Sequence, residues 1–411
     1  MRIKLLIALA KQGQHELADT MLRRYPLTGK YAVNRTLYIQ GLILRGRKDN
    51  KGAVAKFRAA LADDPKLSLV RTDLAETLVD MGEDDSAKHH LQLLEAEAPD
   101  AQVASNIRAF IDRIDQNRPL RFNAFMSVAP STNITNGSSH DTVKVYDPLT
   151  GGMKDAAVTS KHKSGIGAAI GGNVSYNKSL GQNWAVVLAA GGSARIYKDH
   201  SFNSFGLSQS FDVRYMQDKS SIGVGLIANE SIKNDLSDIP YYAFGPRVST
   251  SVNVSVRDVI TATSIFEKRI YRHATAVNGW ASFNDLGWTH SLDSATNVST
   301  TIGFNRIKSG FKPYSYKTWY TGLDLYKELP HGITANLGGQ VQYSTFDEYN
   351  ALGLKFRKDT RAIASIGLVK RDWNMFGFAP SAEYTFVKNF SNLDIYDYNS
   401  HNFDFRLTKD F

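Results

Sequence analysis

The side chains that could carry metal or nucleophile chemistry in this chain are ten histidines, and there is no cysteine. Without cysteine the chain has no disulfide, no thiolate metal ligand and no cysteine nucleophile. The stretch HELAD at 15–19 begins like the zinc-protease motif H-E-x-x-H, which places two histidines on one helix face around a metal. Asp19 stands where the second histidine belongs, so we interpret His15 as a surface residue of a helix.

Four further histidines fall in segments that we expect to be loops: His140, His162, His200 and His273. Loop histidines can bind a metal or haem, but solvated side chains are the better interpretation here. The stretch GIGAAIGG at 165–172 begins like a dinucleotide-binding loop, yet Ile170 replaces its third glycine and the segment continues as a strand. Small side chains on a strand explain this segment.

The chain also lacks the G-x-S-x-G, H-E-x-x-H and phosphate-loop motifs. A Ser/His pair brought together only by folding, as in a membrane hydrolase, stays open as an alternative. The sequence therefore predicts no catalytic residue, no cofactor and no metal site, and we do not expect an enzyme.

Charge and hydropathy narrow the class of protein. The chain has 411 residues and a formal net charge of +9 at pH 7, which is scattered rather than gathered in tracts. This weakens a nucleic-acid interpretation and fits contact with anionic lipid or an acidic partner. No apolar run approaches the roughly 18 residues of a transmembrane helix. The start MRIKLLIALAKQG resembles the first half of a signal peptide, but a helix of a helical array is the better interpretation.

Aromatic residues divide the chain into two parts. The first 118 residues hold only Tyr25, Tyr31, Tyr38, Phe57 and Phe110, whereas all five tryptophans lie further along. We expect a domain boundary at this change of composition. It separates a helical domain over residues 1–118 from a second domain over residues 119–411.

Repetition defines the first part. Apolar residues recur there at helical spacing, and Pro65 and Pro99 are separated by the length of a tetratricopeptide repeat, a pair of antiparallel helices. We expect two repeats, with a half-repeat before them and a capping helix over about residues 101–117. Two residues depart from the repeat pattern: Leu37 stands where the pattern usually has tryptophan, and Arg71 stands where it favours a large apolar residue. The residues expected to pack the helix pairs are Gly41, Leu44, Ala53, Phe57, Ala60, Pro65, Ala75, Leu78, Ala87, Leu91, Leu94 and Pro99.

Such arrays present a concave groove and bind protein segments, so we expect docking from this part. A generic helical bundle is the alternative.

From Pro119 onward the apolar period changes to two, which is the period of strands. Val248 and Val252, for example, alternate with Arg247, Ser249 and Asn253. About fourteen such strands are expected, with short turns alternating with longer connections, the longest over residues 131–163. This regular alternation and even strand number are typical of an outer-membrane β-barrel with a polar lumen.

Tryptophans support the membrane interpretation over a soluble stack of sheets. Trp184, Trp288 and Trp373 fall close to the short turns, and aromatic residues are expected where a barrel wall meets lipid headgroups.

The last strand must pair with the first to close such a barrel. It has one apolar face and ends the chain on phenylalanine, which resembles the assembly signal of bacterial outer-membrane proteins. The residues of this barrel-assembly signal are Phe403, Phe405, Leu407 and Phe411, and Lys409 breaks the alternation once. We expect Phe411→Ala to lower the amount of assembled, heat-modifiable barrel.

The domain order, the strand number, the segment FNAFMSVAPSTNITNG at 122–137 and the Phe-terminated last strand together resemble the surface lipoprotein assembly modulator (Slam) family of type XI secretion proteins. The resemblance covers essentially the whole chain. It implies a translocator in the bacterial outer membrane that moves a lipoprotein, or a soluble hemophilin-like protein, from the periplasm to the cell surface or the medium.

The same resemblance implies that the helical domain lies in the periplasm and docks cargo or chaperone. The partners would be the protein cargo, a periplasmic chaperone, the barrel-assembly machinery and outer-membrane lipid, with no nucleic acid. Two other classes stay open. One is a passive porin or nutrient channel, which gives no reason for a protein-binding array. The other is a polysaccharide-export barrel, whose helical arrays are usually much longer.

Overall fold

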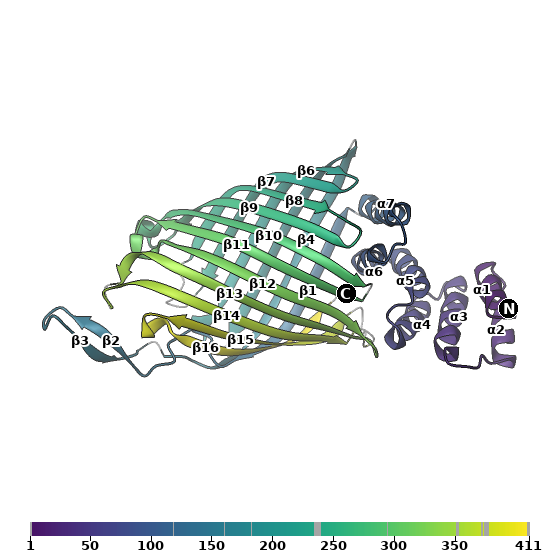
Figure 1. The fold of residues 1–411 in the computed structure, drawn as a ribbon, viewed down its shortest axis with the longest axis horizontal. Helices are drawn as coiled ribbons and strands as arrows, with labels where there is room; N and C mark the ends of the chain where they lie inside the picture. Colours follow the sequence, from purple (N-terminus) through teal and green to yellow (C-terminus); the bar gives the residue numbers. More distant parts are fainter. Residues whose placement is uncertain are drawn as a thin grey trace.

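A helical array joins one end of a closed β-barrel, and a small hairpin lies beyond the other end (Figure 1). The computed structural model describes residues 2–117, 119–159, 161–181, 183–233, 240–293, 295–350, 353–370, 373 and 378–408. The predicted architecture, a tetratricopeptide-like array followed by an antiparallel barrel of about fourteen strands, is confirmed.

The helices of the array follow one another as antiparallel neighbours. They are α1 (Arg2–Lys11), α2 (His15–Arg24), α3 (Ala32–Gly46), α4 (Asn50–Asp63), α5 (Ser68–Met81), α6 (Asp84–Ala96) and α7 (Ala101–Asn117). The side chain of Asp49 caps α4 by accepting a hydrogen bond from the backbone N–H of Gly52, and Gly82 ends α5 in the left-handed conformation. None of the described helices is both long and apolar enough to span a bilayer.

Small residues let paired helices approach and large residues fill the space between them. Phe57 of α4 is fully buried and lies directly on Gly41 of α3, so a Cβ at position 41 would collide with its ring. Of the other residues predicted to pack the repeats, Ala53, Ala60, Ala75, Leu78, Ala87, Leu91 and Leu94 are buried, Leu44 and Pro65 are half-buried, and Pro99 is exposed between α6 and α7. Their contribution to stability stays a prediction.

The barrel closes through antiparallel pairing of each strand with the next and of the last with the first. Its strands are β1 (Leu120–Ser131), β4 (Gly165–Gly181), β5 (Trp184–Tyr197), β6 (Ser204–Gln217), β7 (Ser220–Lys233), β8 (Tyr241–Asn253), β9 (Asp258–Tyr271), β10 (Gly279–Asp293), β11 (Thr296–Ser309), β12 (Tyr316–Leu329), β13 (Ile333–Asn350), β14 (Lys355–Lys370), β15 (Ala379–Ser391) and β16 (Tyr398–Thr408).

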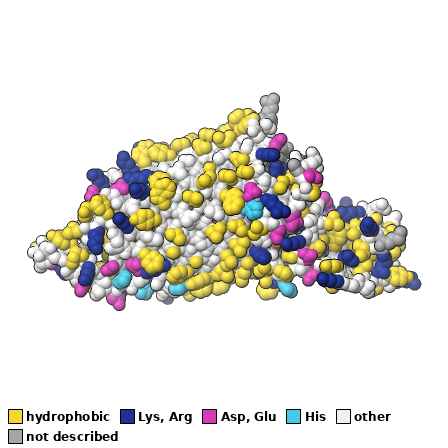
Figure 2. Space-filling view, in the orientation of Figure 1, with side chains coloured by type: hydrophobic (Ala, Val, Ile, Leu, Met, Phe, Trp, Pro, Cys, Tyr) yellow, Lys and Arg dark blue, Asp and Glu magenta, His cyan; other side chains and the backbone are white. Residues whose placement is uncertain are grey.

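Alternation along each strand gives the barrel an apolar outer wall and a polar interior. Leu226 and Leu323 are 60% and 57% exposed on the outside, and hydrophobic side chains are spread over the visible wall in Figure 2, whereas charged side chains lie mostly towards its ends. Asp212 and Glu267 are buried on the opposite side of their strands, where Asp212 accepts a hydrogen bond from Arg247 and Glu267 pairs with Arg269.

The seam between β1 and β16 closes the cylinder. Phe125 is in register with Thr408 and Ser131 with Asn402. At this seam the Arg406 guanidinium lies 4.5 Å from the centre of the Phe125 ring. This contact adds a side-chain interaction to the backbone pairing of the first and last strands.

The two rims of the barrel are built differently. The near rim carries short turns, such as residues 218–219 between β6 and β7, and faces the helices. The far rim carries the longer connections, several of which contain a single 3₁₀ turn: η1 (His200–Phe202), η2 (Thr275–Val277), η3 (Lys312–Tyr314) and η4 (Asp394–Tyr396).

The longest connection holds a hairpin that the periodicity did not reveal. Its strands, β2 (Thr142–Asp147) and β3 (Gly152–Ala157), pair with each other as a separate two-stranded sheet and lie outside the far rim rather than in the lumen (Figure 1). Its base is fixed to the last strand and to the connection before it, since Asn133 donates to the carbonyl of Asn399 in β16 and Ser138 donates to that of Asp394 in η4.

Candidate functional site at the junction of helices and barrel

The helices contact the near rim through polar groups. Lys66, just after α4, forms a 2.8 Å ion pair with Asp293 at the end of β10, and the backbone N–H of His331 donates to the carbonyl of Ala62. α6 also lies against β10, and α7 lies against β4. The junction is therefore formed by the second half of the helical array and by ends of barrel strands that are far from these helices in the sequence.

A buried ion pair forms the centre of the junction. Arg71 of α5 and Glu328 of β12 both have fully buried side chains, and Nη2 of the arginine lies 2.7 Å from Oε2 of the glutamate. The same guanidinium donates to Nδ1 of His90 at 3.0 Å and to the carbonyl of Pro65. Glu328, His90 and the carbonyl of Pro65 together hold the Arg71 guanidinium in one position.

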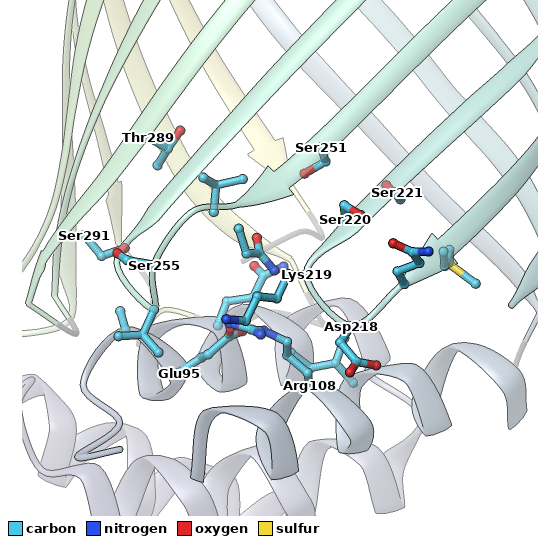
Figure 3. Close-up of a pocket in the computed structure, with 18 of the residues that line it drawn as sticks. Glu95, Arg108, Asp218, Lys219, Ser220, Ser221, Ser251, Ser255, Thr289 and Ser291 are labelled. Atoms are coloured by element: carbon cyan, nitrogen blue, oxygen red, sulfur yellow. The ribbon is translucent and has the colours of Figure 1, made fainter. Parts of the chain in front are cut away.

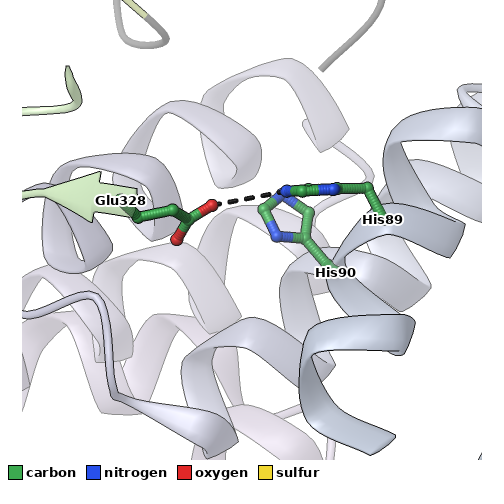
Figure 4. A group of neighbouring side chains, drawn as sticks. All are labelled: His89, His90 and Glu328. Atoms are coloured by element: carbon green, nitrogen blue, oxygen red, sulfur yellow. Dashed lines mark hydrogen bonds and ion pairs between the residues drawn. The ribbon is translucent and has the colours of Figure 1, made fainter. Parts of the chain in front are cut away.

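Two neighbouring histidines complete this cluster (Figure 4). Nε2 of His89 lies 3.4 Å from Oε1 of Glu328, and the hydroxyl of Tyr326 lies 2.9 Å from the same nitrogen. His89, His90 and Glu328 have the donor atoms of a metal site within 4.8 Å of one another. Arg71, however, already occupies Nδ1 of His90 and an oxygen of Glu328, so the cluster fits an interdomain contact better than a cation.

The environment keeps His90 neutral. Burial is the largest cause that lowers the pKa of His90 well below its usual value, and the positive charge of Arg71 acts in the same direction. A neutral imidazole can accept the hydrogen bond from Arg71, which a protonated ring could not do at the same nitrogen.

Next to this cluster, a cavity of about 930 Å³ lies between the helices and the near rim (Figure 3). We call it the vestibule. On one side it is lined by α6 and α7, including Gln92, Glu95 and Arg108, and on the other by the ends of β4 to β11 and their turns. Hydroxyl and amide groups dominate the strand side: Asn177, Ser179, Asn183, Ser220, Ser221, Ser251, Asn253, Ser255, Thr289, Ser291 and Asn297.

Most of these side chains occupy the inward positions of their strands, so the vestibule continues into the lumen. Ser251 and Asn253, for example, alternate with the outward Val252 on β8. Oδ1 of Asn297 is buried and has no hydrogen-bond partner among the described residues, so it offers an acceptor to a donor in the vestibule. Short hydroxyl and amide groups can hydrogen-bond peptide groups without selecting for particular side chains.

The residues singled out from the sequence lie elsewhere. Phe403, Phe405 and Leu407 are 43%, 55% and 42% exposed on the outer face of β16, whereas Phe411 and Lys409 lie outside the described residues. The role of these residues in assembly stays a prediction.

The loop histidines are at the far rim. His200 lies in η1, next to Asn203, and His140 is 3.6 Å from Asp397. His15 begins α2 and is half-buried against Gly46 rather than fully exposed, so its description as a surface residue is only partly right. In GIGAAIGG the inward Gly167 and Gly171 lie beneath the rings of Tyr197 and Phe125, which gives these small residues a packing role.

Sequence reasoning missed the residues of the junction. One signal was available: Arg71 stands where the repeat pattern favours a large apolar residue, and it is the residue that reaches the barrel. Glu328 gave no comparable signal, because a polar residue is ordinary on the lumen face near a strand end.

A tetratricopeptide-like array attached to a closed, outwardly apolar barrel of fourteen strands defines a bacterial outer-membrane barrel protein with a helical repeat domain. The family model of the surface lipoprotein assembly modifiers matches residues 121–411, and that of the tetratricopeptide repeat matches residues 44–109. The chain belongs to the surface lipoprotein assembly modifier family, as the resemblance to Slam proteins predicted. It is an outer-membrane barrel involved in surface lipoprotein assembly, and the family and the fold favour a role in transport or assembly.

Solved barrels resemble the chain only distantly. A FadL homologue of Pseudomonas aeruginosa is 12% identical with a TM-score of 0.43, and covers 74% of this chain and 91% of its own. The outer-membrane channel DcaP of Acinetobacter baumannii is 11% identical with a TM-score of 0.39, and covers 70% of this chain and 96% of its own. A search of curated proteins finds no match to this chain.

Proposed function

We propose that this protein is a translocator that carries one specific lipoprotein, or a soluble hemophilin-like protein, across the outer membrane to the cell surface or the medium. The observation that carries the proposal is the vestibule. It lies between a repeat array, whose general property is to bind protein segments, and the polar interior of the barrel. A segment held by the array is thereby next to the lumen.

In this proposal residues 1–118 form a periplasmic docking domain for the cargo or its chaperone, and residues 119–411 form the membrane domain. The barrel-assembly machinery inserts the barrel into outer-membrane lipid. The lumen is the favoured route because its inward side chains continue from the vestibule. The β1–β16 seam is the alternative route.

The test is cargo localisation. The protein is expressed together with the products of its neighbouring genes in a bacterium that lacks both, and surface, medium and periplasm are compared. We expect one neighbour to move to the surface or the medium only when the barrel is present. If every neighbour stays in the periplasm while small solutes enter faster, the proposal fails and a passive channel replaces it.

Two further measurements separate the alternatives. A passive porin requires a large, steady conductance in planar bilayers that does not change when residues 1–118 are removed. A polysaccharide exporter requires loss of a surface polymer in a deletion strain while surface proteins stay unchanged. We expect neither result.

Cargo selection is assigned to the array. Exchange of residues 1–118 with those of another family member should change which cargo is exported, because the groove helices contact it first. An unchanged cargo after this exchange would move selection to the barrel loops. The control is exchange of the far-rim segment 131–163, which should leave the choice of cargo unchanged.

A further inference from the structure

The junction has the chemistry of a contact that separates and forms again. Arg71 and Glu328 are both 0% exposed, yet they belong to different parts of the molecule and are 257 positions apart. Burying two charges requires removing their hydration, and their attraction in the interior offsets this loss only in part. An apolar pair of similar size would hold the two surfaces together at least as firmly.

The repeat pattern shows that a charged residue at position 71 is unusual. It favours a large apolar residue at position 71, where this chain has arginine. Nε of Arg71 is buried without a hydrogen-bond partner among the described residues, so the pair is imperfect even in the docked position. Arg71 therefore specifies the position of the helices on the rim and holds them there no more firmly than an apolar pair would.

Separation also has a different consequence for charges than for apolar groups. When the helices leave the rim, Arg71 and Glu328 regain water, which compensates for the lost ion pair, whereas separated leucines would be exposed without any compensation. The neighbouring contacts are polar as well: Lys66 with Asp293 and His89 with Tyr326. Relative motion is the ordinary behaviour of two domains unless their interface is large and hydrophobic.

The docked position restricts access to the vestibule, because α6 and α7 form one of its walls (Figure 3). Its volume of about 930 Å³ cannot hold a folded domain, since a folded chain of about 100 residues already has a radius of gyration of about 13 Å. Wider access from the helix side requires that these helices move.

We propose that the Arg71–Glu328 pair is a releasable latch, which holds the helical domain over the near rim in a closed state and separates to admit a polypeptide to the vestibule. The inference rests on the proposed function only for the identity of what is admitted. Opening itself is measured below without cargo, so a failed latch and a failed translocator give different results.

The absence of cysteine makes a distance measurement straightforward. Spin labels are placed on the full chain at Gln92→Cys on α6 and Asp218→Cys in the β6–β7 turn, which lie on opposite walls of the vestibule. Pulsed electron paramagnetic resonance in nanodiscs then gives the distribution of distances. For the parent we expect one dominant short distance.

Glu328→Gln leaves Arg71 buried without a counter-charge, so the longer-distance population should rise by at least roughly tenfold. Asp293→Asn removes the charge from the more accessible pair with Lys66, whose side chain is 60% exposed, and is the matched control, with an expected change below about twofold. The double variant Arg71→Leu/Glu328→Leu should do the opposite of Glu328→Gln and keep the short distance, because separation would expose both leucines.

Folding is checked in each variant by heat-modifiable migration of the barrel and by the helical circular dichroism signal. A folded Glu328→Gln variant with the parent distribution would overturn the latch. Equal opening by Asp293→Asn and Glu328→Gln would also overturn it, as would a double leucine variant that opens. If Glu328→Gln does not fold, the double leucine variant remains as a test, because its opening would overturn the latch.

Discussion

The helical domain and the barrel distribute the same kinds of side chain in opposite ways. Leu74 and Leu78 are fully buried inside the array, whereas Leu226 and Leu323 lie exposed on the outside of the barrel. The barrel instead buries Asp212 and Glu267 in its interior. The outside of one part and the inside of the other are therefore both polar, and they meet at the junction. This explains why ion pairs, amides and hydroxyls connect the two.

The largest expected effect is a cavity in the array. Phe57→Ala removes a fully buried ring, and such changes reduce the free energy of unfolding by about 3–5 kcal/mol. Urea unfolding of the full chain, followed by helical circular dichroism, should show the loss while the barrel stays heat-modifiable. Leu69→Ala on α5, where the side chain is 55% exposed, is the control and should change stability by less than about 0.5 kcal/mol. Equal effects would contradict the assigned core.

A charge on the barrel wall should have the next largest effect. Ile302 points outward at the middle of β11 and is 53% exposed, so Ile302→Lys should destabilise the barrel by about 2–4 kcal/mol in lipid. Thr301→Lys on the adjacent, inward position should change much less, since the lumen is polar. The fraction of folded barrel in denaturant titrations in vesicles measures both. A larger loss for Thr301→Lys would reverse the assignment of inside and outside.

A smaller loss should follow from crowding the array. Gly41→Ala places a Cβ against the ring of Phe57, and such overpacking reduces the free energy of unfolding by about 1–3 kcal/mol. Phe57→Leu in the same chain should remove part of this effect, because the clash involves the ring. Urea unfolding of both single variants and the double variant measures the coupling, and simple additivity would mean that the two residues do not touch.

The smallest effect should come from pH. The pKa of His90 is lowered well below the value of 6.5 of the unfolded chain, first by burial and then by Arg71, His89 and Arg58, whereas Glu328 acts in the opposite direction. Below 6.5 the unfolded chain therefore binds more protons than the folded chain. The contribution of neutral His90 to the free energy of unfolding is therefore complete above about pH 6.5, and it is lost as the pH falls from there towards the lowered pKa.

We accordingly expect a lower urea midpoint for the helices at about pH 5 than at about pH 7.5. His90→Gln should reduce the difference, and a midpoint that rises on acidification would contradict the assigned neutral state of His90.

The periodic features of this chain could be read from the sequence. Alternation along β8 and the repeat spacing of Pro65 and Pro99 depend on local geometry, and local geometry leaves a pattern. The hairpin of β2 and β3 was missed because its strands are only six residues long and carry little alternation.

The junction depends instead on pairings between distant parts of the chain. Nothing near Glu328 in the sequence indicates that Arg71 will lie beside it, since their contact depends on how the last helices turn onto the rim. The vestibule is equally non-local, because its walls come from two helices and the ends of several strands. Only the departure of Arg71 from the repeat pattern gave an early indication of a special position.

The far-rim hairpin provides a site at which the protein can be labelled on intact cells. Its turn contains Leu149, which is 94% exposed, and Gly151 in a left-handed conformation, while the nearby strands pair with each other as a separate two-stranded sheet. Exposed loop tips of this kind accept insertions readily. A short epitope inserted after Leu149 would let an antibody count correctly oriented barrels on living bacteria, with no contact to the junction at the opposite end of the molecule.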